Sequence, residues 1–138
     1  MIARTTAVVI AGVLAGCQTN SKDQILATEE SQLALRSIQT RAFDTTDKEG
    51  TLRTIISTLQ DLGFVIDKAD ATLGSISATK LDGYKLRMSV TVRTRGSTQL
   101  LVRASAQYDN EAVEDPEPYQ HFFAALQRSM FLAAHQVE

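Results

Sequence analysis

The sequence of 138 residues contains one cysteine, two histidines, two prolines and no tryptophan. A single cysteine allows no intramolecular disulfide. His121 and His135 lie about four helical turns apart, or about 21 Å along a helix, so they cannot share a metal ion within one chain. The formal net charge of −2 gives no reason to expect nucleic-acid binding. No apolar run reaches the roughly 20 residues that a transmembrane helix needs.

The N-terminal segment differs from the rest of the chain. One basic side chain, Arg4, precedes an apolar run from Ala7 to Gly16, and a polar stretch begins at Gln18. This order of a positive charge, a short apolar run and small residues is typical of a secretory signal peptide. Cys17 lies where the apolar run meets the polar stretch, and its sulfur is a suitable nucleophile for forming a thioether.

The residues Leu14-Ala15-Gly16-Cys17 resemble the lipobox of bacterial lipoproteins at all four positions. The resemblance implies cleavage between Gly16 and Cys17, a thioether-linked diacylglycerol on Cys17, and a further N-acyl chain of the palmitate type. In lipoproteins with enteric-type sorting, a residue other than Asp after the cysteine directs the protein to the outer membrane rather than the inner membrane. Gln18 therefore implies an outer-membrane anchor with the domain facing the periplasm.

The chain thus divides into a lipoprotein signal peptide (1–16), a polar tether from the lipidated Cys17 (17–32) and a single α+β domain (33–138). We expect the tether to be a flexible coil with a root-mean-square reach of about 20 Å, and a short helix near 24–30. Alternating apolar residues predict a strand over 36–43.

Two amphipathic helices are predicted. Thr46 and Glu49 form a capping box before an apolar stripe, and Gly63 ends that helix in a Schellman motif that brings Phe64 against Leu59. Asp115 is expected to cap a second helix that has Pro116 at its first position and runs to about His135. The residues of the first stripe are Leu52, Ile55, Ile56, Leu59 and Leu62.

Between the helices the apolar period changes from 3.6 to 2, which predicts strands. One begins at Phe64, the next covers Ser75–Leu81, and two long strands meet at Gly96-Ser97. Their alternation implies one buried and one solvated sheet face. Together with the helices, this predicts an α+β two-layer sandwich: a mainly antiparallel sheet of about five strands with two helices packed on one face.

Basic residues occupy the predicted solvated face. Two interpretations stay open. The face is a docking surface for an acidic partner or an anionic glycolipid, or it is a solvated surface whose charge discourages edge pairing. The excess of arginine favours contact, because guanidinium groups form bidentate pairs. The residues of this candidate partner-binding face are Lys85, Arg87, Arg93, Arg95 and Arg103.

Catalytic and metal-binding motifs are not evident. No serine lies in a Gly-x-Ser-x-Gly turn, and no glycine-rich phosphate loop occurs. The acidic residues from Asp109 to Glu117 are either a calcium loop or, as their spacing favours, a solvated loop with a helix cap. The aromatic residues Tyr119, Phe122 and Phe123 line a ligand pocket or, as we favour, pack in the core. We therefore expect no catalytic residue, no metal and no cofactor beyond the lipid on Cys17.

A second resemblance concerns the domain. Leu62-Gly63-Phe64-Val65-Ile66, followed by Leu73-Gly74-Ser75-Ile76, resembles the helix-grip domains of a lipoprotein subunit of the outer-membrane β-barrel assembly machinery, and also small lipoproteins of unassigned function. It covers little more than a helix-to-strand junction. It implies a non-enzymatic binding or scaffold module of the cell envelope with a protein partner. The alternative is a periplasmic carrier of a small apolar ligand or lipid, which requires a sizeable apolar cavity.

Replacing Cys17 with alanine tests the anchor. Because each buried methylene contributes about 0.8 kcal/mol, two or three acyl chains hold essentially all of the protein on the membrane. The Cys17→Ala variant lacks the sulfur, and we expect it to incorporate no radiolabelled palmitate and to leave the membrane fraction. Gln18→Ala is the matched control and should keep its label. Labelled, membrane-bound Cys17→Ala protein would contradict the prediction.

Overall fold

The computed structural model describes residues 19–81 and 83–135, which form three helices and six strands. The chain divides into two compact units, Met1–Gln32 and Leu33–Glu138. The predicted signal peptide and the lipidation site at Cys17 lie outside the described residues. In chain order the elements are α1 (Thr19–Gln39), β1 (Thr40–Phe43), α2 (Lys48–Asp61), β2 (Val65–Asp70), β3 (Ser75–Leu81), β4 (Lys85–Arg95), β5 (Gln99–Tyr108), β6 (Glu111–Ala112) and α3 (Pro116–His135).

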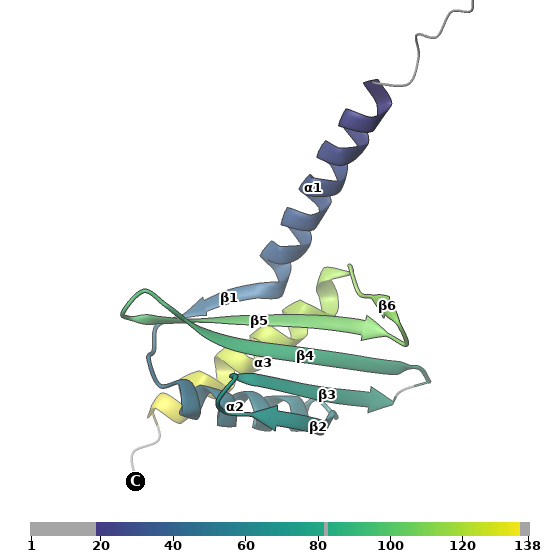
Figure 1. The fold of residues 1–138 in the computed structure, drawn as a ribbon. Coiled ribbons are helices and arrows are strands. Elements are labelled where there is room, and N and C mark those ends of the chain that lie inside the picture. Colours follow the sequence, from purple (N-terminus) through teal and green to yellow (C-terminus); the bar gives the residue numbers. More distant parts are fainter. Residues whose placement is uncertain (1–18, 82, 136–138) are drawn as a thin grey trace, which may run out of the picture. The chain divides into compact units, whose positions relative to one another are not determined.

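All strand pairs of the sheet are antiparallel, in the order β1-β5-β4-β3-β2, and β6 also pairs with β5 (Figure 1). This confirms the predicted α+β sandwich with a mainly antiparallel sheet. The short strand β6 was not predicted, because its two residues lie in the acidic segment that we interpreted as a loop. β2 to β5 follow one another as neighbours, whereas β1 crosses to the far edge and pairs with β5.

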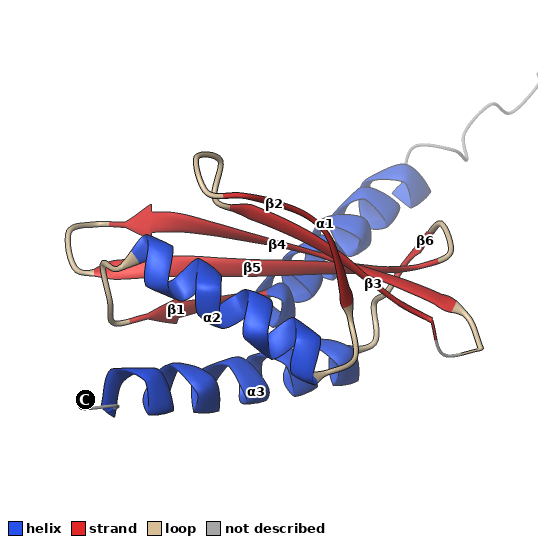
Figure 2. Ribbon diagram, turned by 90° about the horizontal axis from the view of Figure 1, so that it is seen from below, coloured by secondary structure: helices blue, strands red, loops and turns tan. Residues whose placement is uncertain are grey.

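The two faces of the sheet have opposite character. On β4 the residues Leu86, Met88, Val90 and Val92 are at most 9% exposed, and the residues between them are mostly exposed. Helices α2 and α3 pack across the apolar face, as Figure 2 shows. Neither of these two helices covers the opposite face, which we call the open face. It carries the polar residues of the alternating pattern, so the predicted register of β4 and β5 is correct.

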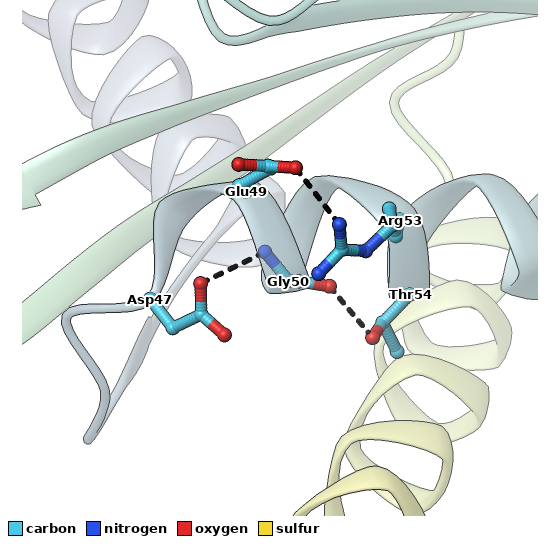
Figure 3. A network of polar contacts seen from close by, with 5 residues as sticks. All are labelled: Asp47, Glu49, Gly50, Arg53 and Thr54. Carbon is cyan, nitrogen blue, oxygen red and sulfur yellow. Dashed lines mark hydrogen bonds and ion pairs between the residues drawn. The ribbon is translucent and has the colours of Figure 1, made fainter.

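The start of α2 differs from the predicted capping box. The N-cap is Asp47, whose Oδ1 accepts a hydrogen bond from the Gly50 amide at 2.9 Å (Figure 3). Glu49 instead pairs with Arg53 at 2.8 Å. A carboxylate is favoured over the Thr46 hydroxyl here because it adds a negative charge at the positive end of the helix dipole. A Cβ at position 50 would collide with the Asp47 carboxylate, so the absence of a side chain at Gly50 allows Asp47 to cap the helix.

The end of α2 is the predicted Schellman motif. Gly63 has a φ of +89°, a conformation that glycine adopts without a Cβ penalty. The Phe64 amide donates to the Leu59 carbonyl at 2.9 Å, and the Gly63 amide donates to the Gln60 carbonyl at 3.0 Å. Phe64 and Leu59 are both buried. The turn therefore connects α2 directly to β2 and places the Phe64 side chain, just before the strand, in the core.

The segment before the sheet was predicted incorrectly. Helix α1 covers Thr19–Gln39, where we expected coil over most of the tether and a strand from residue 36. No glycine or proline occurs between residues 18 and 49, so no residue of low helix propensity interrupts the segment. Leu35 and Ile38, spaced as on one helix face, pack against the core. The strand begins only at Thr40.

One buried hydroxyl group joins three parts of the domain. The Tyr119 side chain of α3 is fully buried. Its hydroxyl donates to the Val113 carbonyl at 2.7 Å and accepts from the Ala106 amide at 3.1 Å and from the Gln39 side-chain amide at 3.2 Å. These three bonds use the full capacity of a hydroxyl group, which has one donor and two acceptor positions. They tie α3 to β5, to the chain after β6, and to the end of α1.

Removal of this hydroxyl should destabilise the domain. Tyr119→Phe leaves the buried groups of Ala106, Val113 and Gln39 without their partner, and each unpaired group costs about 1–3 kcal/mol. We expect the free energy of unfolding to fall by about 2–3 kcal/mol, measured by urea denaturation. Tyr84→Phe is the matched control: it removes a hydroxyl at a position that is 52% exposed, with a single hydrogen bond to Tyr108, and should lower the free energy of unfolding by less than about 1 kcal/mol. Equal effects of the two variants would contradict the assigned role.

Candidate functional site

All five predicted basic residues lie on the open face and are exposed. They do not form one cluster. Along β4, Arg87 and Arg93 are separated by about 20 Å at the usual rise per residue of a strand. Lys85 and Arg87 therefore lie toward one end of the sheet, and Arg93 and Arg95 toward the other. The structure brings Arg93 together with Arg103 of β5 and keeps Lys85 and Arg87 apart from this pair, whereas Arg95 lies two residues beyond Arg93 on the same face.

Arg93 and Arg103 line a pocket of about 360 Å³ on the open face. The third arginine of this pocket is Arg36, from the last turn of α1. We call it the arginine pocket. Sequence reasoning missed Arg36 because the segment was interpreted as a strand. Its complete lining is Arg36, Thr40, Ser89, Thr91, Arg93, Leu101, Arg103 and Ser105.

The strand register explains how the arginine pocket is built. Arg103 lies in the middle of a row across three strands, between Thr40 of β1 and Thr91 of β4. Arg93 is paired with Leu101 and is therefore the diagonal neighbour of Arg103, at about 7–8 Å between Cα atoms. The backbone hydrogen bonds between β4 and β5 therefore fix the Cα atoms of two arginines side by side on adjacent strands.

No carboxylate lines the arginine pocket, and within 19–81 and 83–135 none of its three arginines forms an ion pair. The structure shows an ion pair of Arg53 with Glu49 on α2, and a contact of His121 with Glu117 at 3.9 Å on α3, which is an ion pair only when the histidine is protonated. The charge of the pocket is therefore not neutralised by the described part of the protein. Such a site attracts anions, and the attraction weakens as salt concentration rises.

A hydrogen-bond chain connects the pocket to the core. Arg103 Nη2 donates to Gln39 Oε1 at 3.3 Å, and the Gln39 amide donates to the Tyr119 hydroxyl at 3.2 Å. Gln39 is 5% exposed, although it is a polar residue at the edge of the sheet. Gln39 thus holds the Arg103 guanidinium group through one of its five N–H donors, and the other four donors are available to a ligand in the pocket.

Lys85 and Arg87 line a different and more open hollow, of about 890 Å³. Two exposed apolar side chains, Val65 and Leu81, lie in it. It also contains a carboxylate, Asp67, which accepts a hydrogen bond from the Thr79 hydroxyl at 2.6 Å. This end of the open face therefore offers a mixture of apolar and charged contacts, as expected of a protein-binding surface, rather than a focused anion site.

A third pocket, of about 290 Å³, lies between the helices and the sheet. Phe64, Leu86, Met88 and Phe122 give it an apolar wall, and charged residues such as Asp115 and Glu117 also line it. Tyr84 and Tyr108 meet edge to face at its rim, with centroids 4.7 Å apart. Burial raises the pKa of the Tyr108 hydroxyl, and its hydrogen bond to Tyr84 raises this pKa further.

The aromatic and acidic segments have structural roles. Tyr119, Phe122 and Phe123 are at most 1% exposed and form part of the core, as we favoured. Asp115 Oδ1 accepts from the Glu117 amide at 3.0 Å and so caps α3. In the described ranges, no three His, Cys, Asp or Glu side chains lie close enough to hold a metal ion. None of the described helices is both long and apolar enough to span a membrane.

The crowding of like charges can be measured as a salt-dependent stability. Removal of one charge by Arg93→Gln should raise the free energy of unfolding by a few tenths of a kcal/mol at low salt, because like charges on adjacent strands repel. The control Arg53→Gln breaks the pair with Glu49 and should lower it by about 0.2–0.5 kcal/mol. Both effects should shrink at high salt. A loss of stability in Arg93→Gln at low salt would show that the charge is already neutralised.

No protein-family model matches the sequence, and no curated protein matches it.

Proposed function

We propose that this protein is an outer-membrane lipoprotein, anchored through Cys17, whose periplasm-facing domain binds an acidic envelope protein through the open face of the sheet. The observation that carries the proposal is the set of five exposed basic residues spread along a sheet face that α2 and α3 leave free. The role is non-enzymatic. Guanidinium and ammonium groups at neutral pH donate hydrogen bonds and attract anions, but they do not accept protons.

The mechanism is capture by a tethered surface. The acyl chains restrict the domain to the membrane surface, which raises its local concentration toward partners in the same compartment. The positive face then steers an acidic surface into contact and fixes its orientation. Bidentate contacts from the arginines, together with burial of Val65 and Leu81, supply the attraction at short range. The partner is therefore expected to carry carboxylates around a small apolar patch.

The test compares two double charge reversals in the lipidated protein. Arg87→Glu/Arg95→Glu changes the open face outside the arginine pocket, and Arg53→Glu/Arg128→Glu makes the same charge change on α2 and α3. Chemical crosslinking in intact cells followed by mass spectrometry identifies the partner. We expect the first variant to capture about tenfold less of it, and the second to capture as much as the unmodified protein.

A second measurement shows that the capture is direct. The purified lipidated protein in non-ionic detergent should bind the purified partner with a Kd that rises steeply with salt. If the Arg87→Glu/Arg95→Glu variant binds as tightly as the control, the open face is merely solvated and the proposal is wrong. The same conclusion follows if the captured protein lacks an acidic surface.

The pocket between the helices and the sheet supports a second candidate, a carrier of a small apolar ligand or lipid. Its volume of about 290 Å³ lies at the lower end of the range for small-molecule sites. The wall of Phe64, Leu86, Met88 and Phe122 suits an apolar group, whereas the nearby Asp115 and Glu117 do not. Mass spectrometry of lipids that copurify with the protein tests this alternative, and a stoichiometric apolar ligand would favour it over docking.

A further inference from the structure

The three arginines of the arginine pocket come from three separate elements and converge on one small volume. Arg36 lies on α1, Arg93 on β4 and Arg103 on β5. We propose that the arginine pocket binds a phosphate group, either on a lipid headgroup or on a soluble phosphate ester. This goes beyond the proposed function, because it assigns a small-anion site within a face that otherwise docks a protein.

The charge of the pocket matches a phosphate better than a carboxylate. Three arginines line it, and its lining contains no carboxylate. A phosphate monoester carries about −1.5 to −2 charges at pH 7, whereas a single carboxylate carries −1. A phosphate also offers at least three oxygens, so several planar guanidinium forks can each make paired hydrogen bonds with it. The second hollow, with Lys85 and Arg87, already contains Asp67 and is the weaker anion site.

Hydroxyl groups complete the donor set. Four hydroxyl groups line the pocket. Within the described part of the chain, none of these four hydroxyl groups forms a hydrogen bond with another protein group. A hydroxyl can donate to a phosphate oxygen without adding charge. Leu101 of β5, the apolar residue of the lining, is partly buried. These hydroxyl groups belong to Thr40, Ser89, Thr91 and Ser105.

The site is also partly preorganised. Gln39, buried and held by the Tyr119 hydroxyl, accepts a hydrogen bond from Arg103 and so acts as a positioning residue. The two β-strands fix the Cα atoms of Arg93 and Arg103. Ligand binding then has less side-chain freedom to remove, which favours affinity. The volume of about 360 Å³ exceeds that of a bare phosphate and leaves space for the group to which it is esterified.

The test uses the lipidated protein in non-ionic detergent and titrates inorganic phosphate by calorimetry. Arg36→Gln removes one charge from the pocket. Arg87→Gln, the matched control, removes one charge from the same face outside it. We expect phosphate to bind the unmodified protein, Arg36→Gln to weaken binding by about tenfold, and Arg87→Gln to change it by less than about twofold. Acetate should bind at least about tenfold more weakly than phosphate.

Three outcomes would overturn the assignment: no phosphate binding by the unmodified protein, equal losses in the two variants, or equal binding of acetate and phosphate. To distinguish a lipid headgroup from a soluble ester, displacement of bound inorganic phosphate is measured in micelles that contain phosphatidic acid, with phosphatidylcholine as the control lipid. Displacement of inorganic phosphate by phosphatidic acid supports the assignment with a headgroup as the ligand. Binding of inorganic phosphate that phosphatidic acid does not displace supports it with a soluble ester.

Failure of this inference can be separated from failure of the proposed function. Arg36 is not one of the five residues of the docking face, so Arg36→Gln should capture the envelope partner as the unmodified protein does. The Arg87→Glu/Arg95→Glu variant should lose the partner and still bind phosphate, with a loss smaller than the tenfold of Arg36→Gln. Its changes lie outside the pocket lining and act only through the screened field, in the case of Arg95 from about 7 Å along β4.

Discussion

The hydroxyl group of Tyr119 lies in the core and forms three hydrogen bonds with groups that are distant in sequence. It joins the start of β1 and the end of β6 to the part of β5 between them, because Gln39 immediately precedes β1 and Val113 immediately follows β6. An unpaired polar group in this position would be costly, so the three hydrogen bonds hold these segments together. The position of Arg103 on the surface depends on this buried group through Gln39.

The sheet separates stability from binding. Its apolar face and the two helices supply the core, whereas the open face contributes little to the core and is free to carry charge. Placing like charges side by side on β4 and β5 lowers stability, since no described carboxylate neutralises them. Binding of an external anion between these arginines would neutralise their charges and offset this loss of stability. The proposed partner and the proposed phosphate would both use this face: the hollow with Lys85 and Arg87 lies toward one end of it, and the arginine pocket lies toward the other.

Local patterns predicted most of the fold. The period of two on β4 and β5, the apolar stripe of α2 and the Gly63 turn each depend on residues close in sequence, and the structure agrees with all three. The pattern misled us at α1, because that helix has no broad apolar stripe and several of its apolar residues stay exposed. Likewise, Thr46 and Asp47 are adjacent and both are residue types that cap helices, so the sequence alone does not show which of them accepts the hydrogen bond at the helix start.

The sequence by itself determined the lipobox-like motif, the α+β class and which face each basic residue of β4 and β5 occupies, because these follow from residue type and local period. Only the tertiary structure decided that Arg93 and Arg103 are neighbours while Lys85 and Arg87 lie apart, since this depends on strand register. The place of Arg36 beside them, and the role of Gln39, required the pairing of β1 with β5. That pairing joins segments about sixty residues apart, and no local pattern encodes it.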